Sequence, residues 1–429
     1  MKRALVWFKT DLRLHDNETL TRSIAQCEEV IPVYCFDEAQ FGDSVFGFQK
    51  TGAFRAQFLL ESVANLDQNL RALGSGLVVV CGHPETEIVA LAQQFGVQKV
   101  FAKKEVAYEE CKTQEQVEKA LWGIRCLFET FSTSTMYHAE DLPFTLKDIP
   151  DVFTNFRKRV EKDAAIRPVF ETPTHIKSPE LPPIDLPSLE KWRLTQPNMD
   201  PRAVLAFKGG ETAALQRLHH YLFDTQALSV YKQTRNGLIG SDYSSKFSAW
   251  LSVGCLSARQ IVLEIRKYEA QFGANESTYW MIFELLWRDY FRFMVKKYKH
   301  QYFLQNGIKP QNAKTVSDNE EVLNQWVQGQ TGNEFVDANM RELQLTGFMS
   351  NRGRQNVASY LCHELHFDWR YGAAYFEQQL IDYDVCSNWG NWAYLAGVGN
   401  DPRGLRVFNV DKQATEYDKD RAYRDLWLK

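Results

Sequence analysis

Thirteen consecutive residues, 382–394, combine groups that a plain hydrophobic core has no reason to assemble. The carboxylates of Asp382 and Asp384 lie within a few residues of the Asn388 amide and of several aromatic rings, among them Trp392 and Tyr394. Aromatic faces suit a flat ligand, and the acids and amides suit its polar edge. The segment therefore predicts the seat of a flat molecule with polar edges.

Two other interpretations of the paired acids have to be weighed. Asp382 and Asp384 alone could serve a metal ion or acid–base chemistry, but no histidine accompanies them at ligand spacing. His363 and His366 are three residues apart without a carboxylate or thiolate pattern beside them, so we expect no metal site. Arg354 is the natural ion-pair partner of these acids, because neither charge is cheap to bury alone.

A second set of reactive side chains follows helical spacing. Glu284, Trp287, Arg288 and Phe291 recur at i, i+3, i+4 and i+7, so one face carries an acid, an indole and a guanidinium. A basic face with interleaved rings suits nucleic acid; a solvated amphipathic helix with Trp287 in the core is the plain alternative. The positive charge is extended by Arg292, Lys296, Lys297 and Lys299.

A serine-rich turn precedes another expected helix. Residues 231–237 (YKQTRNG) lead to residues 241–248 (SDYSSKFS), and Trp250 and Leu251 then begin an apolar run. Hydroxyls and unpaired N–H groups at a helix start suit a phosphate or pyrophosphate. A serine-rich helix cap without any ligand is the alternative.

The length and composition of the chain limit the kinds of fold that could position these groups. At 429 residues with 44% hydrophobic residues, the chain is long enough for two domains. The net charge of −4 argues against coating nucleic acid through global charge, so an anionic partner would need a local basic groove. Eight cysteines without a CxxC pair predict reduced thiols and a cytoplasmic location.

The N-terminal part alternates short apolar runs with helical patterns. A helix is expected from about Thr51 to Leu73, and the alternation predicts an α/β doubly wound parallel sheet over residues 1–133. The expected strands are Leu5 to Phe8, Val30 to Phe36, Leu77 to Cys81, Val100 to Phe101 and Cys126 to Phe131.

The rest of the chain has a different character. Ten of the fourteen prolines lie between Pro143 and Pro201, so residues 134–200 are predicted to be an interdomain connector. Residues 201–429 show helical spacing and are predicted to form an all-α domain. We expect neither a leader peptide nor a membrane span, because the first residues enter a strand and no apolar run reaches about 18 residues.

Six ordered segments give the chain a resemblance to a known family. The chain resembles the photolyase and cryptochrome family of flavoproteins, specifically its DASH cryptochrome branch, over nearly its whole length. The segments are residues 5–17 (LVWFKTDLRLHDN), 137–144 (YHAEDLPF), 156–161 (FRKRVE), 232–237 (KQTRNG), 351–355 (NRGRQ) and 397–403 (GVGNDPR).

The resemblance implies a folded FAD inside the helical domain. Arg354 and Asp382 would form a buried pair against its ring, Asp384 would lie at the polar edge, and Asn388 would face flavin N5. Asparagine at that position favours a fully reduced, repair-competent flavin. The phosphates would be held by Tyr231, Ser244, Ser245, Lys246, Phe247 and Ser248, with Arg288 near them.

The resemblance also implies a cavity for a flipped-out cyclobutane pyrimidine dimer, which an electron from the excited reduced flavin would split. Glu284 would bond to the base edge and stabilise its radical anion, while Trp287 stacks on it, contributing roughly 1 to 3 kcal/mol per base. Asn351 and Tyr394 would complete the walls. Further nucleic-acid contacts are expected from Arg235 and Arg352.

Tyr394 stands where duplex-active photolyases have a second tryptophan. Flipping a dimer out of a duplex costs a few kcal/mol, which a smaller, more polar cavity would not recover. We therefore expect a monomer that repairs mainly single-stranded or looped DNA, with RNA left open as a further partner.

Two expectations concern light and electrons. Trp392 and Trp369 match the first two members of the tryptophan chain that reduces the flavin, but the third position is Val316, which predicts slow or rerouted photoreduction. The family also implies an antenna, commonly a methenyltetrahydrofolate, and Glu105 and Glu109 lie where a folate-contacting acid is expected.

Two other functions remain as alternatives. One is a blue-light photoreceptor or regulator that binds nucleic acid without repair; the end of the chain about 25 residues after the last family segment argues against an output arm. The other is a light-indifferent electron-transfer flavoprotein, which would not need the cavity of Glu284, Trp287 and Tyr394.

Overall fold

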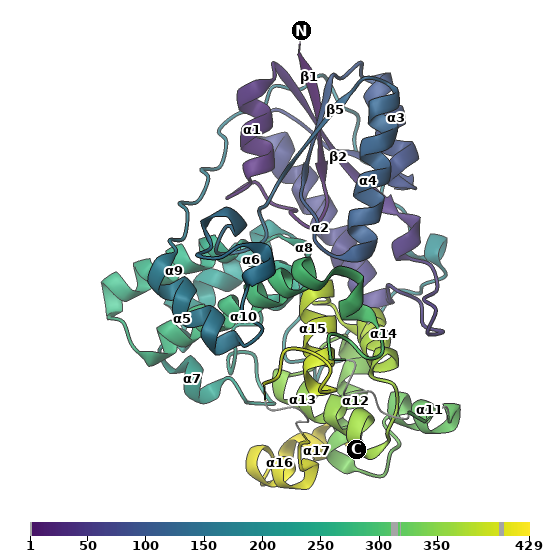
Figure 1. Cartoon of the computed structure of the whole chain (residues 1–429), viewed down its shortest axis with the longest axis vertical. Coiled ribbons are helices and arrows are strands. Elements are labelled where there is room, and N and C mark those ends of the chain that lie inside the picture. Colours follow the sequence, from purple (N-terminus) through teal and green to yellow (C-terminus); the bar gives the residue numbers. More distant parts are fainter. Residues whose placement is uncertain (1, 310–315, 318, 403–406) are drawn as a thin grey trace.

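The computed structural model describes residues 2–309, 316–317, 319–402 and 407–429. An α/β part that contains the N-terminus lies at one end of the molecule, and a larger helical part lies at the other (Figure 1). The eight cysteines, all of them within the described residues, form no disulfide. None of the helices formed by the described residues is both long and apolar enough to cross a bilayer.

The α/β part is built on a five-stranded parallel sheet with the order β3-β2-β1-β4-β5. This order doubles back at β1, as in doubly wound folds, so the predicted fold class is confirmed. All five predicted strands are present: β1 Arg3–Phe8, β2 Glu29–Asp37, β3 Val78–Gly82, β4 Lys99–Lys103 and β5 Leu127–Phe131.

Alternate residues of the central strand supply two separate cores. Leu5 and Trp7 of β1 pack on one face, which α3 and α4 cover, while Val6 and Phe8 pack on the opposite face under α1 and α2. Side chains of a strand alternate between faces, so an apolar strand buried on both sides needs helices on both. These helices are α1 Glu18–Gln26, α2 Ala53–Ala72, α3 Pro84–Gln94 and α4 Tyr108–Gly123, with the short η1 Glu38–Gln40 between β2 and α2.

The loop that follows β1 joins the sheet to the helical part. Asp16 is fully buried and pairs with the Arg259 guanidinium at 2.6 Å, and Arg13 donates to the Gly254 carbonyl at 2.9 Å. A side chain at Gly254 would lie 2.1 Å from the Thr10 carbonyl, and its φ of +75° favours glycine. The loop therefore fits closely against the helical part.

The helical part contains no strand among its described residues beyond isolated bridges. Its described residues form eleven α-helices after α6, and π-turns interrupt it twice, at η5 His220–Asp224 and η9 Tyr360–Glu364. The α-helices are α6 Glu211–His219, α7 Tyr231–Thr234, α8 Ser248–Val253, α9 Ala258–Phe272, α10 Glu276–Tyr298, α11 Glu320–Gln328, α12 Glu334–Thr346, α13 Asn351–Ser359, α14 Trp369–Gln379, α15 Val385–Leu395, α16 Val410–Tyr417 and α17 Ala422–Leu428, and the short 3₁₀ turns are η6 Ala227–Val230 and η7 Lys299–Phe303.

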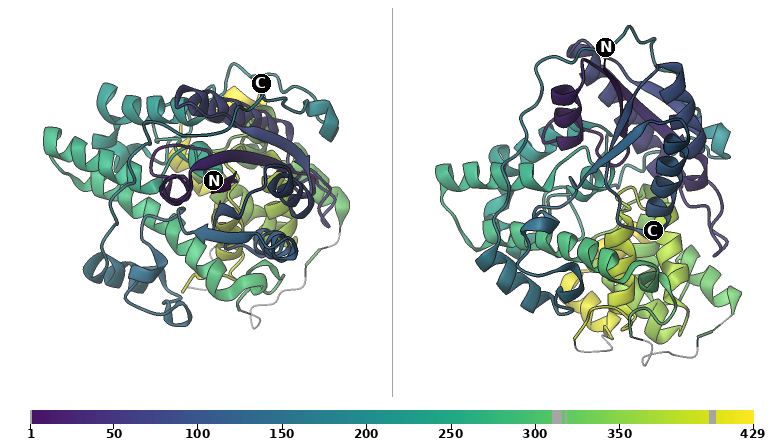
Figure 2. Two further views of the ribbon diagram at one scale, coloured as in Figure 1. Left: turned by 90° about the horizontal axis from the view of Figure 1, so that it is seen from above. Right: turned by 45° about the horizontal axis from the view of Figure 1, so that its top comes forward.

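The segment expected to be a connector contains structure of its own. Helix α5, Phe153–Asp163, packs beside α10, and the chain then runs as an extended segment along the α/β part (Figure 2). Phe153, Phe156 and Val160 repeat on one face of α5 and are buried, so this helix belongs to the core. The short helices here are η2 Ala139–Asp141, η3 Leu146–Asp148 and η4 Leu189–Trp192.

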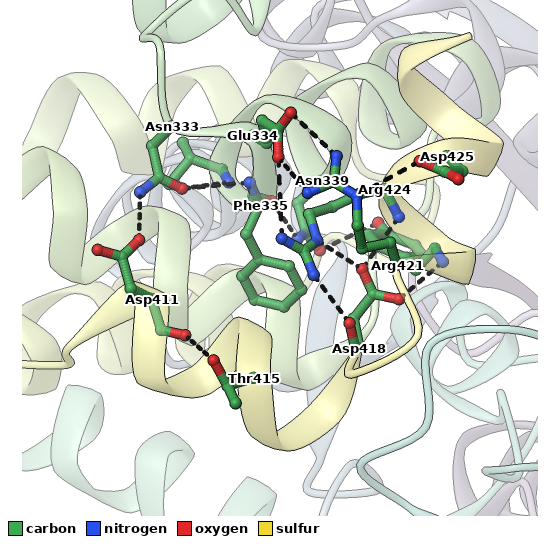
Figure 3. Close-up of polar contacts among 12 residues, drawn as sticks. Asn333, Glu334, Phe335, Asn339, Asp411, Thr415, Asp418, Arg421, Arg424 and Asp425 are labelled. Atoms are coloured by element: carbon green, nitrogen blue, oxygen red, sulfur yellow. Dashed lines mark hydrogen bonds and ion pairs between the residues drawn. The ribbon is translucent and has the colours of Figure 1, made fainter.

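The two C-terminal helices pack against α12, at the end of the molecule away from the sheet (Figure 1). Arg421 pairs with Glu334 at 2.8 Å, and the Asn333 amide donates to Asp411 at 3.2 Å (Figure 3). The buried Tyr423 hydroxyl donates to Glu342, which lies within α12. The C-terminus is thereby tied to a helix that packs directly on α13.

Candidate cofactor and substrate site

A cavity of about 470 Å³ opens between the turn before α8 and helices α10, α13 and α15. A smaller cavity of about 90 Å³ adjoins it and includes Asn388 and Trp392 in its wall. Of all the residues expected at the site, Trp369 is the one that lines neither cavity. The larger cavity is lined by Tyr231, Arg235, Ser244, Ser245, Lys246, Phe247, Ser248, Glu284, Trp287, Arg288, Asn351, Arg352, Arg354, Asp382, Asp384 and Tyr394, among others.

The serine-rich turn is held in place by Arg217 of α6. Its guanidinium donates to the carbonyls of Ser241, Ser244 and Ser245 at 3.0 to 3.3 Å and pairs with Asp242 at 2.7 Å. The helix that follows has six residues, so its dipole contributes little to an anion site. Fixed hydroxyls and a nearby cation therefore matter more here than the helix start.

That cation is Lys246, whose side chain is buried although lysine is rarely so. Its ammonium donates to the Ser244 hydroxyl at 2.9 Å and lies over the Tyr243 ring at 3.1 Å from its centre. Burial and, to a smaller extent, the neighbouring Arg217 lower the pKa of Lys246 to about 6. An anion bound beside this ammonium would restore its charge.

Two buried ion pairs form one end of the cavity, which we call the floor. Arg354 donates to both carboxylate oxygens of Asp382 at 2.9 and 3.0 Å, so the pair expected from the sequence is present. Asp384 pairs instead with Arg292 at 3.0 Å, with both side chains less than a tenth exposed. The floor comprises these four residues and Asn388.

The role expected of Arg292 on an exposed basic face was wrong, because the residue points inward to Asp384. Lys297 is also engaged elsewhere, since its ammonium pairs with Asp151 at 2.8 Å and donates to the Ile149 carbonyl at 2.7 Å. The sequence did contain a signal for Arg292: it lies one and two turns beyond Arg288 and Glu284 on the same face of α10.

Asp384 is set up to remain a carboxylate. Burial alone would raise its pKa, but Arg292 and Arg288 outweigh burial and hold the pKa of Asp384 at about 2. The side chain also caps α15, accepting the Ser387 N–H at 2.8 Å. This acid thus begins the helix that carries Asn388, whose amide donates to the Ala373 carbonyl at 2.9 Å and is fixed in orientation.

A second group of residues in the cavity wall, which we call the mouth, comprises Arg235, Glu284, Trp287 and Tyr394. Glu284 accepts from the Arg235 guanidinium and from the indole N–H of Trp280 at 3.1 Å. Burial raises the pKa of Glu284, and the Arg235 charge opposes that rise without cancelling it. This carboxyl is therefore shifted toward its neutral form, opposite to Asp384.

Aromatic rings shape the mouth. Trp287 stacks on Phe153 of α5, with ring centres 3.6 Å apart, and meets Tyr394 edge-on at 5.9 Å. Both rings are half-buried, and Asn351 is exposed at the start of α13. Arg352 donates to Asn236 and Gln413 at 3.0 Å, so this expected nucleic-acid contact is engaged within the protein.

The expected electron chain is only partly visible as ring contacts. Trp392 is buried and touches Trp326, with ring centres 6.1 Å apart, whereas Trp369 touches Trp389 at 5.7 Å. Val316 is half-buried next to Ser317, which bridges to Phe367 beside Trp369. An aliphatic side chain therefore occupies the neighbourhood where a third tryptophan was expected.

The two acids considered for an antenna differ in their surroundings. Glu105 is buried and already paired with Lys9 at 3.2 Å and Lys103 at 3.3 Å. Glu109 is largely exposed and pairs with Lys50 at 2.6 Å. The folate antenna stays a prediction.

The described part of the chain contains no group of three or more His, Cys, Asp or Glu side chains that could hold a metal ion. His363, one of the two histidines considered, instead contacts the Leu395 carbonyl at 2.9 Å through Nε2. The pair of acids at Asp382 and Asp384 is occupied by arginines.

Comparisons with known proteins agree with this geometry. The DNA photolyase family model matches residues 4–180, and the model for the FAD binding domain of DNA photolyase matches residues 280–429. The two models together define the class: the chain belongs to the photolyase and cryptochrome family.

Relatives narrow the class further, to the DASH cryptochrome branch. A cryptochrome DASH of Gloeobacter violaceus is 51% identical over 430 residues, covering 100% of this chain and 85% of the relative. The crystal structure of a Synechocystis cryptochrome superimposes with a TM-score of 0.96 at 47% identity, covering 100% of this chain and 89% of the other. A class III photolyase of Agrobacterium tumefaciens gives a TM-score of 0.85 at 25% identity, covering 100% and 86%.

The side chains present fit an FAD molecule. Lys246 and Arg288 line the cavity together with the serine hydroxyls of the fixed turn, a donor set that suits a pyrophosphate. The floor offers ionised carboxylates, guanidinium groups and the Asn388 amide to a polar ring edge. The serine-rich turn lies outside the matched FAD binding model, so its assignment rests on the side chains alone.

Proposed function

We propose that the protein repairs cyclobutane pyrimidine dimers under blue light, chiefly in single-stranded or looped DNA, using reduced FAD as electron donor. One observation carries this proposal: the cavity joins a floor of fixed charges to a mouth in which a carboxyl with a raised pKa faces two perpendicular rings. A flavoprotein that only relays electrons needs the floor and not the mouth.

The mouth residues have separate tasks in this proposal. Glu284, shifted toward its neutral form, donates a hydrogen bond to a carbonyl oxygen of the flipped dimer as negative charge develops there. To do so it exchanges its present contact with Arg235, whose guanidinium is then free for a phosphate. Trp287, already stacked on Phe153, offers its other side to a base.

The floor residues keep the cofactor in place. FAD, when bound and reduced, supplies the light-activated electron that opens the dimer ring. Arg354 and Asp382 hold one another against the expected ring position, and Asp384 stays ionised through Arg292. Asn388, fixed by the Ala373 carbonyl, offers its remaining amide groups to the ring edge.

The single-strand preference rests on Tyr394. Its ring is smaller than an indole and carries a hydroxyl, so it gives a flipped base less stacking surface than tryptophan would. Unpairing a duplex costs a few kcal/mol, and a single strand avoids this cost. The proposed order of substrates is therefore single strand, then looped DNA, then duplex.

The test measures dimer loss under blue light with the flavin kept reduced. Matched oligonucleotides carry one thymine dimer as a single strand, in a loop or in a duplex. We expect the single strand to be repaired fastest; equal rates on single strand and duplex would contradict the substrate proposal. No turnover on any substrate, with a flavin that still photoreduces, would instead support the photoreceptor alternative.

The proposal extends to the supply of electrons and light. Trp392 and Trp369 would carry electrons toward the flavin, more slowly than in relatives with a third tryptophan at the position of Val316. A methenyltetrahydrofolate antenna would be identified by releasing the bound chromophores from purified protein. Cytoplasmic location, monomeric state and RNA binding stay predictions from the sequence.

A further inference from the structure

Two further aromatic residues, Trp389 and Tyr383, lie near the expected electron carrier Trp369. Trp389 touches Trp369, with ring centres 5.7 Å apart, and lies three residues before Trp392 on the same helix. The indole N–H of Trp389 donates to the Tyr383 hydroxyl at 3.2 Å. Trp389 thus connects Trp369 to a tyrosine.

An electron chain needs an outer end that a donor in solution can reach. Val316 cannot be oxidised at the potentials of indoles and phenols, so it cannot provide that end. The rings in contact with Trp392 are Trp326 and Phe376, which are both buried, and Tyr375 beside Trp326 is 3% exposed. Tyr383, in contrast, is half-buried rather than enclosed.

The surroundings of Tyr383 suit oxidation coupled to loss of its proton. The Glu377 carboxyl of α14 lies near the phenol, and burial raises the pKa of Glu377 although Arg55 opposes this rise. A carboxylate with a raised pKa is a better proton acceptor. The Arg55 guanidinium lies 4.6 Å from the centre of the Tyr383 ring, facing the same carboxyl.

We propose that Tyr383, reached through Trp389, is the terminal electron donor of this protein and replaces the tryptophan missing at Val316. The inference rests on the proposed function, because it assumes that Trp392 and Trp369 carry electrons toward the flavin. The photoexcited oxidised flavin is the oxidant, and a thiol in solution is the final reductant.

Oxidation of the indoles leaves a Trp389 radical cation; it takes one electron from Tyr383, whose O–H proton passes to the Glu377 carboxylate. The products are neutral Trp389, a neutral tyrosyl radical and a protonated Glu377. The thiol then gives one electron and one proton to the phenoxyl oxygen, and Glu377 releases its proton to solvent.

The proton transfer gives this outer end a function. The electron held by the reduced flavin returns readily to a radical cation left on an indole. It can return to a neutral tyrosyl radical only when the proton returns as well. The reduced flavin would therefore persist long enough for the thiol to act.

The test is flash spectroscopy and electron paramagnetic resonance on the FAD-loaded protein, with signals normalised to bound FAD. In the wild type we expect a tyrosyl radical that forms more slowly in D₂O. Tyr383→Phe should leave a tryptophanyl radical, lower the photoreduction rate several-fold with a thiol donor, and abolish the isotope effect. Tyr371→Phe, which alters a half-buried tyrosine of the same helix as Trp369, is the matched control and should change neither signal.

Two further variants separate this inference from a structural effect. Glu377→Gln keeps the phenol and removes the proton acceptor, so it should also lose the tyrosyl radical. Val316→Trp added to Tyr383→Phe should recover the photoreduction rate without a tyrosyl signal. Recovery is not expected if the tyrosine change had merely disturbed the fold.

The results for Trp392→Phe and Tyr383→Phe distinguish a failure of this inference from a failure of the tryptophan path that the proposed function assumes. If Trp392→Phe leaves photoreduction unchanged, the tryptophan path and this inference both fail. If Trp392→Phe blocks photoreduction while Tyr383→Phe keeps the wild-type radical and rate, the tryptophan path stands and Tyr383 is not its outer end. A tyrosyl signal that disappears in Tyr371→Phe instead would assign that end to Tyr371.

Discussion

The floor and the mouth of the cavity shift the pKa values of their carboxyl groups in opposite directions. Asp384 in the floor has a side chain 9% exposed and a pKa held at about 2. Glu284 in the mouth has a side chain 30% exposed and a raised pKa. Each acid is partnered by arginine, so the presence of an ion pair does not explain the difference.

The surroundings of each pair explain it. Two guanidinium groups, of Arg292 and Arg288, act on Asp384, and the α15 N–H of Ser387 also donates to it. Glu284 receives a single guanidinium charge, from Arg235, and its desolvation is larger than that attraction. A cavity can thus keep one acid permanently charged for a cofactor and a second acid ready to hydrogen bond with a substrate.

The largest expected effect comes from breaking the floor. Arg292→Met leaves the Asp384 carboxylate buried without its main partner, which should lower the free energy of unfolding by about 3 to 5 kcal/mol and reduce bound FAD. Urea unfolding and the ratio of flavin to protein absorbance measure both. The matched change in the mouth, Arg235→Met, should cost no more than ~1 kcal/mol, because that pair is partly exposed. Equal losses would contradict the distinction.

A substitution in the mouth should instead lower the rate of dimer repair. Glu284→Gln replaces the carboxyl O–H donor by a weaker amide N–H donor, so the hydrogen bond strengthens less as charge develops on the dimer and the repair rate should fall by up to about 10²-fold. Bound FAD and stability should stay close to the wild type. Glu276→Gln alters an exposed acid on the same helix and should repair normally. A loss of FAD in Glu284→Gln would mean that this acid also serves the floor.

Lowering the pH should change the contributions of Asp384 and Glu284 to the stability of the fold in opposite directions. The folded-state pKa of Asp384, about 2, lies below its ordinary value of 3.8, so its stabilisation is present above pH 4 and is lost as pH falls to 2. The expected loss is ~2 kcal/mol, absent in Asp384→Asn. Glu284, with a raised pKa, should stabilise the fold as pH falls through its folded-state pKa. Unfolding of the wild type, of Asp384→Asn and of Glu284→Gln from pH 7 to 2 measures this.

The smallest expected effect concerns Tyr394. Tyr394→Trp should add about 1 kcal/mol of stacking to a flipped dimer and raise duplex repair about fivefold relative to single-strand repair. The measurement is the ratio of the two rates for wild type and variant. An unchanged ratio would show that the preference for single strands arises outside the mouth.

Much of the fold could be predicted because its signals are local. Each strand of the sheet is a short apolar run, and α2 begins and ends within two residues of the range expected from its apolar face. Helix α5 was missed because proline-rich flanks surround it, although Phe153, Phe156 and Val160 are spaced as in a helix.

The sequence allowed the residues of the site to be predicted, but not all of the ion pairs between them. The Arg354–Asp382 pair was expected and is present, whereas Arg292 was assigned to a surface it does not reach. Which of several arginines meets a given acid depends on how α10 and α15 are packed, and residues 92 positions apart carry no local sign of that choice. The same holds for Trp389 and Tyr383, whose contact depends on the turn into α15.

The closely fitted loop after β1 has a consequence for cooperativity. Asp16 and Arg259 are both nearly inaccessible, so pulling the sheet away from the helices would break this ion pair and expose the apolar surfaces packed around it. That intermediate is too costly to accumulate, and the two halves should melt together in one calorimetric peak. The sheet is therefore part of the same thermodynamic unit as the cavity, although no residue of its strands lines the two cavities described.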